Sequence, residues 1–358
     1  MRSTRAVVSL ARARGAFQSL PVVDGAGLFS PDPAVRRRAS QTLGDATRQA
    51  GFFYLVGHGV PPALGERMVR QAAAFFALPL EQKLALHIGR SANHRGYVPP
   101  GEEAFYGGGR DRKEAFDLAL DLPPDDPAVV AGTPMLGPNV WPDLPGFKAD
   151  VQSYYDAVFA LGRRLLRGFA LALDLPEESF DAFVTKPPSQ LRLVHYPFDP
   201  ADADGAGIAA HTDYECFTIL LPTAPGLEVM NGAGSWVDAP PLDGAFVVNV
   251  GDLMEIWTNG TFVATSHRVR AVREERFSFP LFFCCDYHTE VAPLPLFVSP
   301  DRPPLHAPVR AGEHLYAQTI QSFEYLRTRL AAGEIALPSG ARPLSSLGQA
   351  ARHRETAP

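Results

Sequence analysis

The sequence predicts an α+β protein in which helices pack against a β-sheet jelly roll. Residues 147–175 place apolar side chains every three or four positions, which predicts one long amphipathic helix. From residue 190 onward, short apolar runs alternate with turn pairs such as Asn231-Gly232, a pattern typical of a double-sheet β architecture. An apolar stripe over residues 313–332 predicts a last helix that packs back onto the sheets, so helices and strands share one core.

The elements before the long helix are mixed. Residues 20–24 predict a strand, residues 34–50 a helix, and residues 51–60 a second strand that ends at a glycine-bounded turn. Pro61 then opens a helix that runs to about residue 78. Residues 87–145, rich in glycine and proline, predict loops over a cleft with a few short strands. After the long helix we expect eight strands, at residues 191–196, 217–221, 226–230, 246–250, 253–257, 262–264, 267–272 and 277–283.

Composition limits the class of protein. Lys and Arg number 33 against 39 Asp and Glu, and this net charge of −6 argues against a dedicated nucleic-acid surface. Three cysteines, two of them adjacent, do not make a disulfide framework, so we expect a reducing compartment, the cytoplasm. No apolar run is long enough for a membrane-spanning helix. We therefore expect no nucleic-acid, membrane or obligate protein partner.

Two histidines and one aspartate in the second half predict a metal site. His211 and Asp213 stand two positions apart in an extended segment, so their side chains point to the same face. A second predicted strand offers His267 as the third ligand. Two imidazoles and one carboxylate on one side of a metal leave the opposite positions open, which suits non-haem Fe(II) and O2 rather than a thiolate-rich zinc site. The alternative is a non-catalytic jelly-roll binding protein in which all three residues are structural.

A cation on the last predicted strand indicates a carboxylate-binding site. Arg276 and Ser278 stand two positions apart, and the phenylalanines that flank them indicate burial of the arginine. A buried arginine needs an anionic partner, and a guanidinium beside a hydroxyl suits the distal carboxylate of 2-oxoglutarate. Tyr196, on the strand before the metal residues, is placed to donate its hydroxyl to the same carboxylate. The alternatives are a solvent-facing arginine on an edge strand and a tyrosine in the core of a sheet.

With these residues identified, the sequence resembles the isopenicillin N synthase-like family of Fe(II)- and 2-oxoglutarate-dependent dioxygenases over nearly its whole length. The motifs of the first half are LPVVD at 20–24, GFFYLVGHG at 51–59, RGYVPP at 95–100, KEAF at 113–116 and GPNVWP at 137–142. Those of the second half are HTD at 211–213, GLEV at 226–229, WVDAP at 236–240, NVGD at 249–252, HRV at 267–269 and RFS at 276–278. The combination is specific for the family and says little about the substrate.

The resemblance implies a distorted double-stranded β-helix with helices on its major sheet. It also implies a set of ligands, with Fe(II) bound by His211, Asp213 and His267 and with 2-oxoglutarate held by Arg276, Ser278 and Tyr196. Many members have Asn two positions before the tyrosine, whereas this chain has Val194, so one polar contact near the co-substrate is expected to be missing. The isopenicillin N synthase branch uses the same arginine–serine clamp for a peptide and needs no 2-oxoglutarate. An Fe(II) oxidase of that kind is therefore a second alternative.

The implied activity is that of a dioxygenase that uses Fe(II), O2 and 2-oxoglutarate. It would oxidise, and by default hydroxylate, a small to medium organic substrate while it releases succinate and CO2. We expect the wall of the substrate pocket to include Tyr97, Phe116, Tyr214 and Phe283. Substrate identity, oligomeric state and the choice between hydroxylation, desaturation and cyclisation stay open at this level.

The chain is expected to divide into four parts. Residues 1–18 form a basic tail with four arginines and no acidic residue, a composition shared with organellar transit peptides, so targeting is the alternative to a plain tail. Residues 19–186 form the N-terminal helical and mixed region of the dioxygenase fold. The catalytic jelly-roll core is expected at residues 187–300, and a C-terminal helix and tail at residues 301–358.

Overall fold

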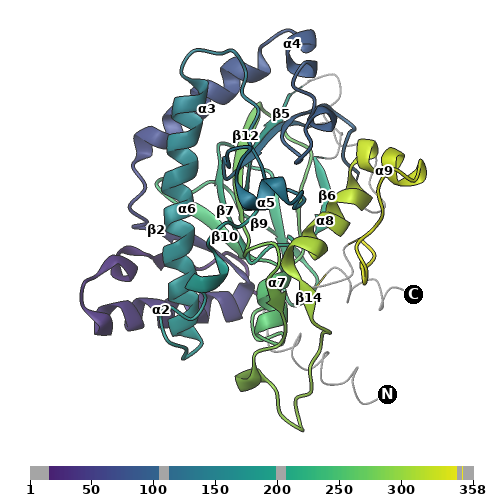
Figure 1. Cartoon of the computed structure of the whole chain (residues 1–358). Helices are drawn as coiled ribbons and strands as arrows, with labels where there is room; N and C mark the ends of the chain where they lie inside the picture. Colours follow the sequence, from purple (N-terminus) through teal and green to yellow (C-terminus); the bar gives the residue numbers. More distant parts are fainter. Residues whose placement is uncertain (1–15, 105–112, 199–206, 345–348, 350–358) are drawn as a thin grey trace.

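The computed structural model describes residues 16–104, 113–198, 207–344 and 349 (Figure 1). The strands are β1 (Val22–Asp24), β2 (Phe52–Val56), β3 (Gly96–Val98), β4 (Glu114–Ala119), β5 (Gln190–Tyr196), β6 (Ile208–His211), β7 (Phe217–Pro222), β8 (Leu227–Met230), β9 (Trp236–Asp238), β10 (Phe246–Val250), β11 (His267–Val269), β12 (Arg276–Phe283), β13 (Glu290–Val291) and β14 (Val309–Arg310). The α-helices are α2 (Pro33–Ala50), α3 (Pro62–Phe76), α4 (Leu80–Leu84), α5 (Pro127–Val130), α6 (Phe147–Ala172), α7 (Asp252–Trp257), α8 (Ala311–Ser322) and α9 (Glu324–Ala331). Short 3-10 helices are η1 (Ala26–Phe29), η2 (Ile88–Arg90), η3 (Asp181–Phe183) and η5 (Pro295–Phe297).

Twelve of these strands form two facing sheets, and β13 and β14 pair in a separate two-stranded sheet. The eight-stranded major sheet has the order β1-β2-β10-β7-β12-β5-β4-β3, and the four-stranded minor sheet has the order β6-β11-β8-β9. The β1–β2 pair is parallel, whereas the other pairs in these sheets are antiparallel. One apolar cluster joins Phe52 and Leu220 of the major sheet to Leu227 and Val229 of the minor sheet, so the sheets pack face to face. The predicted α+β jelly roll is confirmed.

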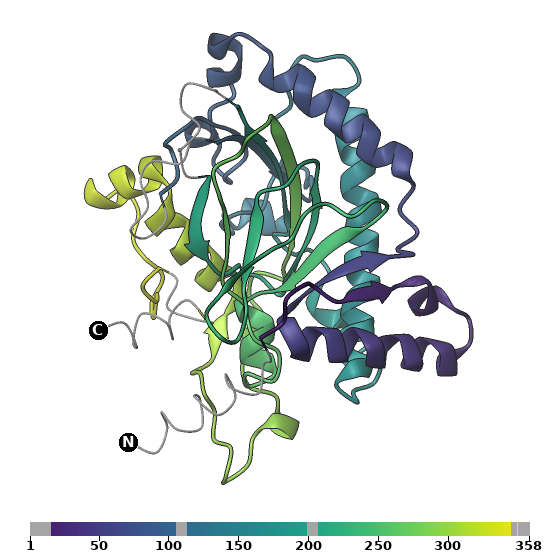
Figure 2. The ribbon, with the colours of Figure 1, turned by 180° about the vertical axis from the view of Figure 1, so that it is seen from behind.

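The helices cover the outside of this sandwich. In both views α2, α3 and α6 lie on one side of the strands, and α8 and α9 lie on the other (Figures 1 and 2). The long helix α6 packs closely on β12 through Gly162, where an added Cβ would stand 2.3 Å from the ring of Phe283. Helix α2 begins where Asp32 accepts a hydrogen bond from the backbone N–H of Ala34, and it ends at Gly51 in the left-handed conformation.

The N-terminal region is part of the same sheet system as the second half. Its strands β1 to β4 occupy both ends of the major sheet. The predicted division into four parts stays a prediction, and residues 1–15 of the predicted basic tail lie outside the described residues. Phe17, at the end of that tail, is buried in the cluster between the sheets. Within the described ranges, no helix combines the length and the apolar character that crossing a bilayer requires.

Three predicted elements differ in the structure. Residues 253–257, predicted as a strand, belong to helix α7, and residues 262–264 form no strand. Every residue of α7 is buried. The spacing of apolar residues along this segment therefore cannot distinguish a helix from a strand. The predicted helix at 313–332 is interrupted at Phe323, whose extended backbone forms a β-bridge with Glu103.

Candidate active site

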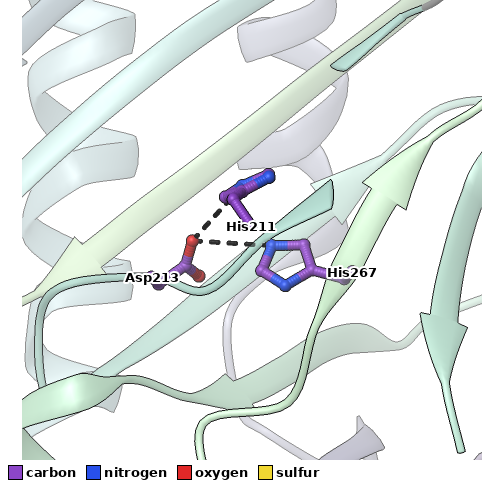
Figure 3. A group of neighbouring side chains, drawn as sticks. All are labelled: His211, Asp213 and His267. Carbon is purple, nitrogen blue, oxygen red and sulfur yellow. Dashed lines mark ion pairs between the residues drawn. The ribbon is translucent and has the colours of Figure 1, made fainter. Parts of the chain in front are cut away.

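The three predicted metal ligands converge between the sheets (Figure 3). His211 ends β6 and His267 begins β11, and the two are directly paired in the minor sheet. Asp213 lies in the connection beyond β6 rather than on the strand itself, because β6 ends at His211. One ligand atom from each residue lies within 4.8 Å of the other two. Oδ1 of Asp213 is 3.8 Å from Nε2 of His211 and 3.5 Å from Nε2 of His267.

Hydrogen bonds to the backbone orient both imidazoles. Nδ1 of His211 lies 2.8 Å from the carbonyl oxygen of Ala209, and Nδ1 of His267 lies 3.2 Å from that of Thr265. A carbonyl only accepts, so in each ring Nδ1 carries the proton and Nε2 keeps the lone pair that a metal needs. Both Nε2 atoms face Asp213.

The charges around Asp213 also favour a cation. Burial alone would raise the pKa of Asp213, but His267 and His211 hold it well below its usual range, so the group is a carboxylate. Burial lowers the pKa of His211 to about 4, which keeps that imidazole neutral at physiological pH. Burial opposes protonation of His267, yet the charge of Asp213 raises the pKa of His267 above its ordinary value. A divalent metal would replace that proton as the positive partner of the carboxylate.

A cavity extends from these ligands along the inner faces of both sheets and ends at Arg276, Ser278 and Tyr196. Arg276 is only 1% exposed. Its Nε donates to the carbonyl oxygen of Ala224 at 3.2 Å, and its guanidinium carbon is 4.7 Å from the ring centre of Tyr196. Within the described part of the chain, Nη1 of Arg276 has no hydrogen-bond partner, and burial lowers the pKa of this arginine. A buried cation with an unused donor is chemically suited to bind a carboxylate.

Comparison with known proteins identifies the family. The family model for the non-haem dioxygenase in morphine synthesis N-terminal region matches residues 20–144, and that for the 2OG-Fe(II) oxygenase superfamily matches residues 187–285. A 2-oxoglutarate-Fe(II) type oxidoreductase of Emericella nidulans is 35% identical over 74% of this chain and 78% of its own length. The chain belongs to the 2-oxoglutarate-Fe(II) oxygenase superfamily.

Other oxygenases are similar to this chain over a larger share of its length. The homoarginine-6-hydroxylase of Oryza sativa is 31% identical over 86% of this chain and 98% of its own length. A Caulobacter crescentus oxygenase of this family superposes with a TM-score of 0.73 at 32% identity, over 88% of this chain and 99% of that one. A Neurospora crassa protein solved with alpha-KG (2-oxoglutarate) and thymine has a TM-score of 0.73 at 26% identity, over 89% of this chain and 98% of its own. The resemblance to the isopenicillin N synthase-like family is confirmed.

This oxygenase is a 2-oxoglutarate-dependent Fe(II) dioxygenase, and its cofactors are Fe(II), 2-oxoglutarate and O2. The residues fit that set, since a buried carboxylate and two oriented imidazoles suit Fe(II), and Arg276 offers its unused donor to a carboxylate in the same cavity. The comparisons support neither an oxidase without 2-oxoglutarate nor a non-catalytic jelly roll. Bound Fe(II) would supply the chemistry that couples O2 to the decarboxylation of 2-oxoglutarate, and the protein supplies binding, orientation and exclusion of water.

Three of the four residues expected in the pocket wall lie elsewhere. Tyr97 and Phe116 are paired across β3 and β4 and are buried in the main hydrophobic core, as is Phe283 of β12. The reason is the alternation of strand side chains: Phe283 has the opposite parity to Arg276 and Ser278, so it faces α6 instead of the cavity. Tyr214 does line the cavity.

The same alternation reveals residues that the sequence analysis missed. Counting by twos from Tyr196 along β5, and from Ser278 along β12, gives the side chains on the cavity face: Arg192, Gln190, Pro280 and Phe282. Glu103, Lys113 and helix α8 add further wall residues. No periodicity in the sequence signals these, because they come from a loop and from a helix remote in sequence. Val194 also lines the cavity, and its apolar side chain offers no polar contact there.

Proposed function

We propose that this oxygenase hydroxylates a small organic molecule and converts one 2-oxoglutarate to succinate and CO2 for each hydroxylation. The single observation that carries the proposal is the buried guanidinium of Arg276, which has an unused Nη1 donor in the cavity that also holds His211, Asp213 and His267. A hydroxylase among the relatives supports the same outcome.

Different residues along the cavity have different roles. Arg276, Ser278 and Tyr196 bind and orient the distal carboxylate of 2-oxoglutarate, which fixes where its keto-acid end reaches the iron ligands. Leu220, Leu227 and Val269 are apolar and line the same cavity, so they exclude water from the bound co-substrate.

The test measures succinate release and O2 consumption together in the Fe(II)-loaded enzyme. We expect one succinate per O2 with wild-type protein, and loss of both in the Asp213→Ala variant. O2 consumption that proceeds without any succinate would contradict the proposal in favour of an oxidase that takes all electrons from its substrate.

We further propose that the enzyme works in the cytoplasm without an obligate protein, nucleic-acid or membrane partner. The net charge of −6 and the three cysteines outside any disulfide support this assignment. Fractionation of the source cells, together with size-exclusion chromatography of the active enzyme, tests it. Activity that copurifies with membranes, or that requires a second protein, would contradict it.

A further inference from the structure

The cavity has a second end, away from Arg276. Asn249 pairs with Thr218, Thr218 with Phe282, and Phe282 with Gln190, so the four form one row across the major sheet. Directly paired residues share a face of the sheet, and all four line the cavity. Gln190 therefore lies in the row of Asn249 and Thr218, the two residues that contact Asp213, at the opposite end of β5 from Tyr196.

Apart from Nη1 of Arg276 and the hydroxyl of Thr212, two hydrogen-bond donors of cavity-lining residues have no partner in the described part of the chain. They are Nε2 of Gln190, whose side chain is 6% exposed, and the hydroxyl of Tyr214. Both residues line the cavity. A buried donor without an acceptor destabilises the folded protein, so a ligand that brings an acceptor to it should bind more tightly than one without an acceptor.

Four charged residues in or next to the cavity wall form ion pairs with one another. Arg192 donates to both carboxylate oxygens of Asp117, each at 2.8 Å, and to Glu103 at 2.8 and 3.1 Å. Lys113 donates to the same Glu103 at 2.7 Å. The described residues of this network therefore hold two cations against two carboxylates. A charged ligand would find no unpaired counter-charge in this network, in contrast to Arg276 at the other end. The carboxyl group of Glu215, which accepts the backbone N–H of Tyr214, also lines the cavity and lies outside the network.

The rest of this end is apolar. Phe282 of β12, which pairs directly with Gln190, lines the cavity together with Leu315 of α8 and Phe323 after α8. We propose that the substrate is an uncharged organic molecule with an apolar body and a carbonyl-type acceptor, which Gln190 and Tyr214 bind. The inference rests on the proposed function, since it concerns the same cavity. It separates this enzyme from any relative whose substrate is charged, as homoarginine is in the rice hydroxylase.

The first test compares four probes that share one ring: benzamide, benzoate, protonated benzylamine and toluene. Dissociation constants are measured by calorimetry without O2, on protein loaded with Fe(II) and 2-oxoglutarate. We expect benzamide to bind about tenfold more tightly than each of the other three. Gln190→Leu and Tyr214→Phe should each weaken benzamide by about tenfold and leave toluene unchanged. Three results would each overturn the inference. They are tighter binding of a charged probe than of benzamide, equal affinity for benzamide and toluene, and wild-type affinity for benzamide in both variants.

A second test changes the charge of the wall. Glu103→Gln leaves the network with excess positive charge, so the preference should move toward benzoate. Glu114→Gln is the matched control, because Glu114 is a buried carboxylate on the neighbouring β4, bound by Lys83 and His195 and outside the cavity lining. It should leave the preference unchanged. Gln190→Glu should shift the preference among the probes toward benzylamine. This variant replaces Glu103→Gln as the test of wall charge if circular dichroism shows that Glu103→Gln does not fold.

Binding of 2-oxoglutarate, measured in the same samples, separates the two proposals. Normal 2-oxoglutarate affinity together with the wrong probe preference overturns the inference about the substrate and leaves the proposed function intact. Failure of 2-oxoglutarate to bind overturns both.

Discussion

The side-chain amide of Asn249 donates a hydrogen bond to Oδ2 of Asp213 at 2.6 Å. Thr218 donates its hydroxyl to the same oxygen, so Oδ2 is held by the major sheet while Oδ1 faces both imidazoles of the minor sheet. Asn249 and Thr218 are themselves paired on adjacent strands, β10 and β7. The orientation of the metal-binding carboxylate is therefore set by the sheet that does not carry the histidines.

This relationship predicts that Asn249→Ala weakens Fe(II) binding by about 10- to 100-fold, the usual cost of losing a partner of a metal ligand. The measurement is a metal titration of the purified apo-protein. Asn139→Ala is the control, since Asn139 is a buried amide that makes two hydrogen bonds to Ala119, away from the metal ligands. Equal metal affinity in Asn249→Ala and wild type would mean that Asp213 keeps its orientation without this bond.

Arg276→Met should change stability and binding in opposite directions. Removal of a buried cation without a carboxylate partner should raise the free energy of unfolding of the apo-protein by about 1 kcal/mol or more. The same change should weaken 2-oxoglutarate binding by roughly 100-fold and abolish the rise in Tm that 2-oxoglutarate gives to wild type. Chemical denaturation and calorimetry measure the two effects.

Arg95→Met is the matched control for that experiment. Arg95 is equally buried, but its guanidinium donates to the backbone carbonyl oxygens of Asn93, His94 and Met135. Its loss should lower stability without any specific effect on 2-oxoglutarate. A destabilised Arg276→Met protein that still binds 2-oxoglutarate normally would exclude Arg276 as the carboxylate site.

Glu103 should make the stability of the protein depend on acid pH. Burial opposes its charge, but Arg192 and Lys113 lower the pKa of Glu103 from 4.5 to about 2. A group with a lowered pKa in the folded state stabilises the protein above its unfolded pKa, and this contribution is lost as the pH falls toward the folded value. The difference in unfolding free energy between wild type and Glu103→Gln should thus shrink by about 3 kcal/mol between about pH 6 and about pH 2. A difference that stays constant over this range would contradict the assignment.

The sequence predicted most of the fold because the longer helices are amphipathic. The apolar stripe of α6, for example, faces the sheet. The strand predicted at 253–257 was wrong for a physical reason: all residues of α7 are buried, so tertiary packing rather than periodicity decides its conformation.

Part of the site could be predicted from the sequence because strand side chains alternate between two faces. The spacing of Arg276 and Ser278 placed both on one face of β12, and the structure puts them in one cavity. The same alternation along β12 places Phe282 on the cavity face and Phe283 on the opposite face, in the main hydrophobic core. The network of Glu103 and Arg192 joins residues 89 positions apart, and no local pattern in a single sequence predicts such a contact.

The C-terminal segment should support the metal site through Gln349. Its Oε1 accepts the backbone N–H of Ser266 at 3.0 Å, directly before His267, and its Nε2 donates to the carbonyl oxygen of Asn231 at 3.3 Å. Gln349→Ala removes both bonds, so it should lower stability by about 1–2 kcal/mol and also weaken Fe(II) binding, because β11 loses support where its histidine begins. Unfolding curves and metal titrations measure the two quantities.

Gln318→Ala separates these effects. Gln318 is also buried and donates to the carbonyl oxygen of Arg342, so it holds the C-terminal segment at a point away from β11. We expect its loss to reduce stability by a similar amount while metal affinity stays at the wild-type value. If both variants weaken metal binding equally, the contacts of Arg342 and Gln349 support the site together. If neither does, His267 is positioned by the minor sheet alone, through its pairing with His211 and Val229.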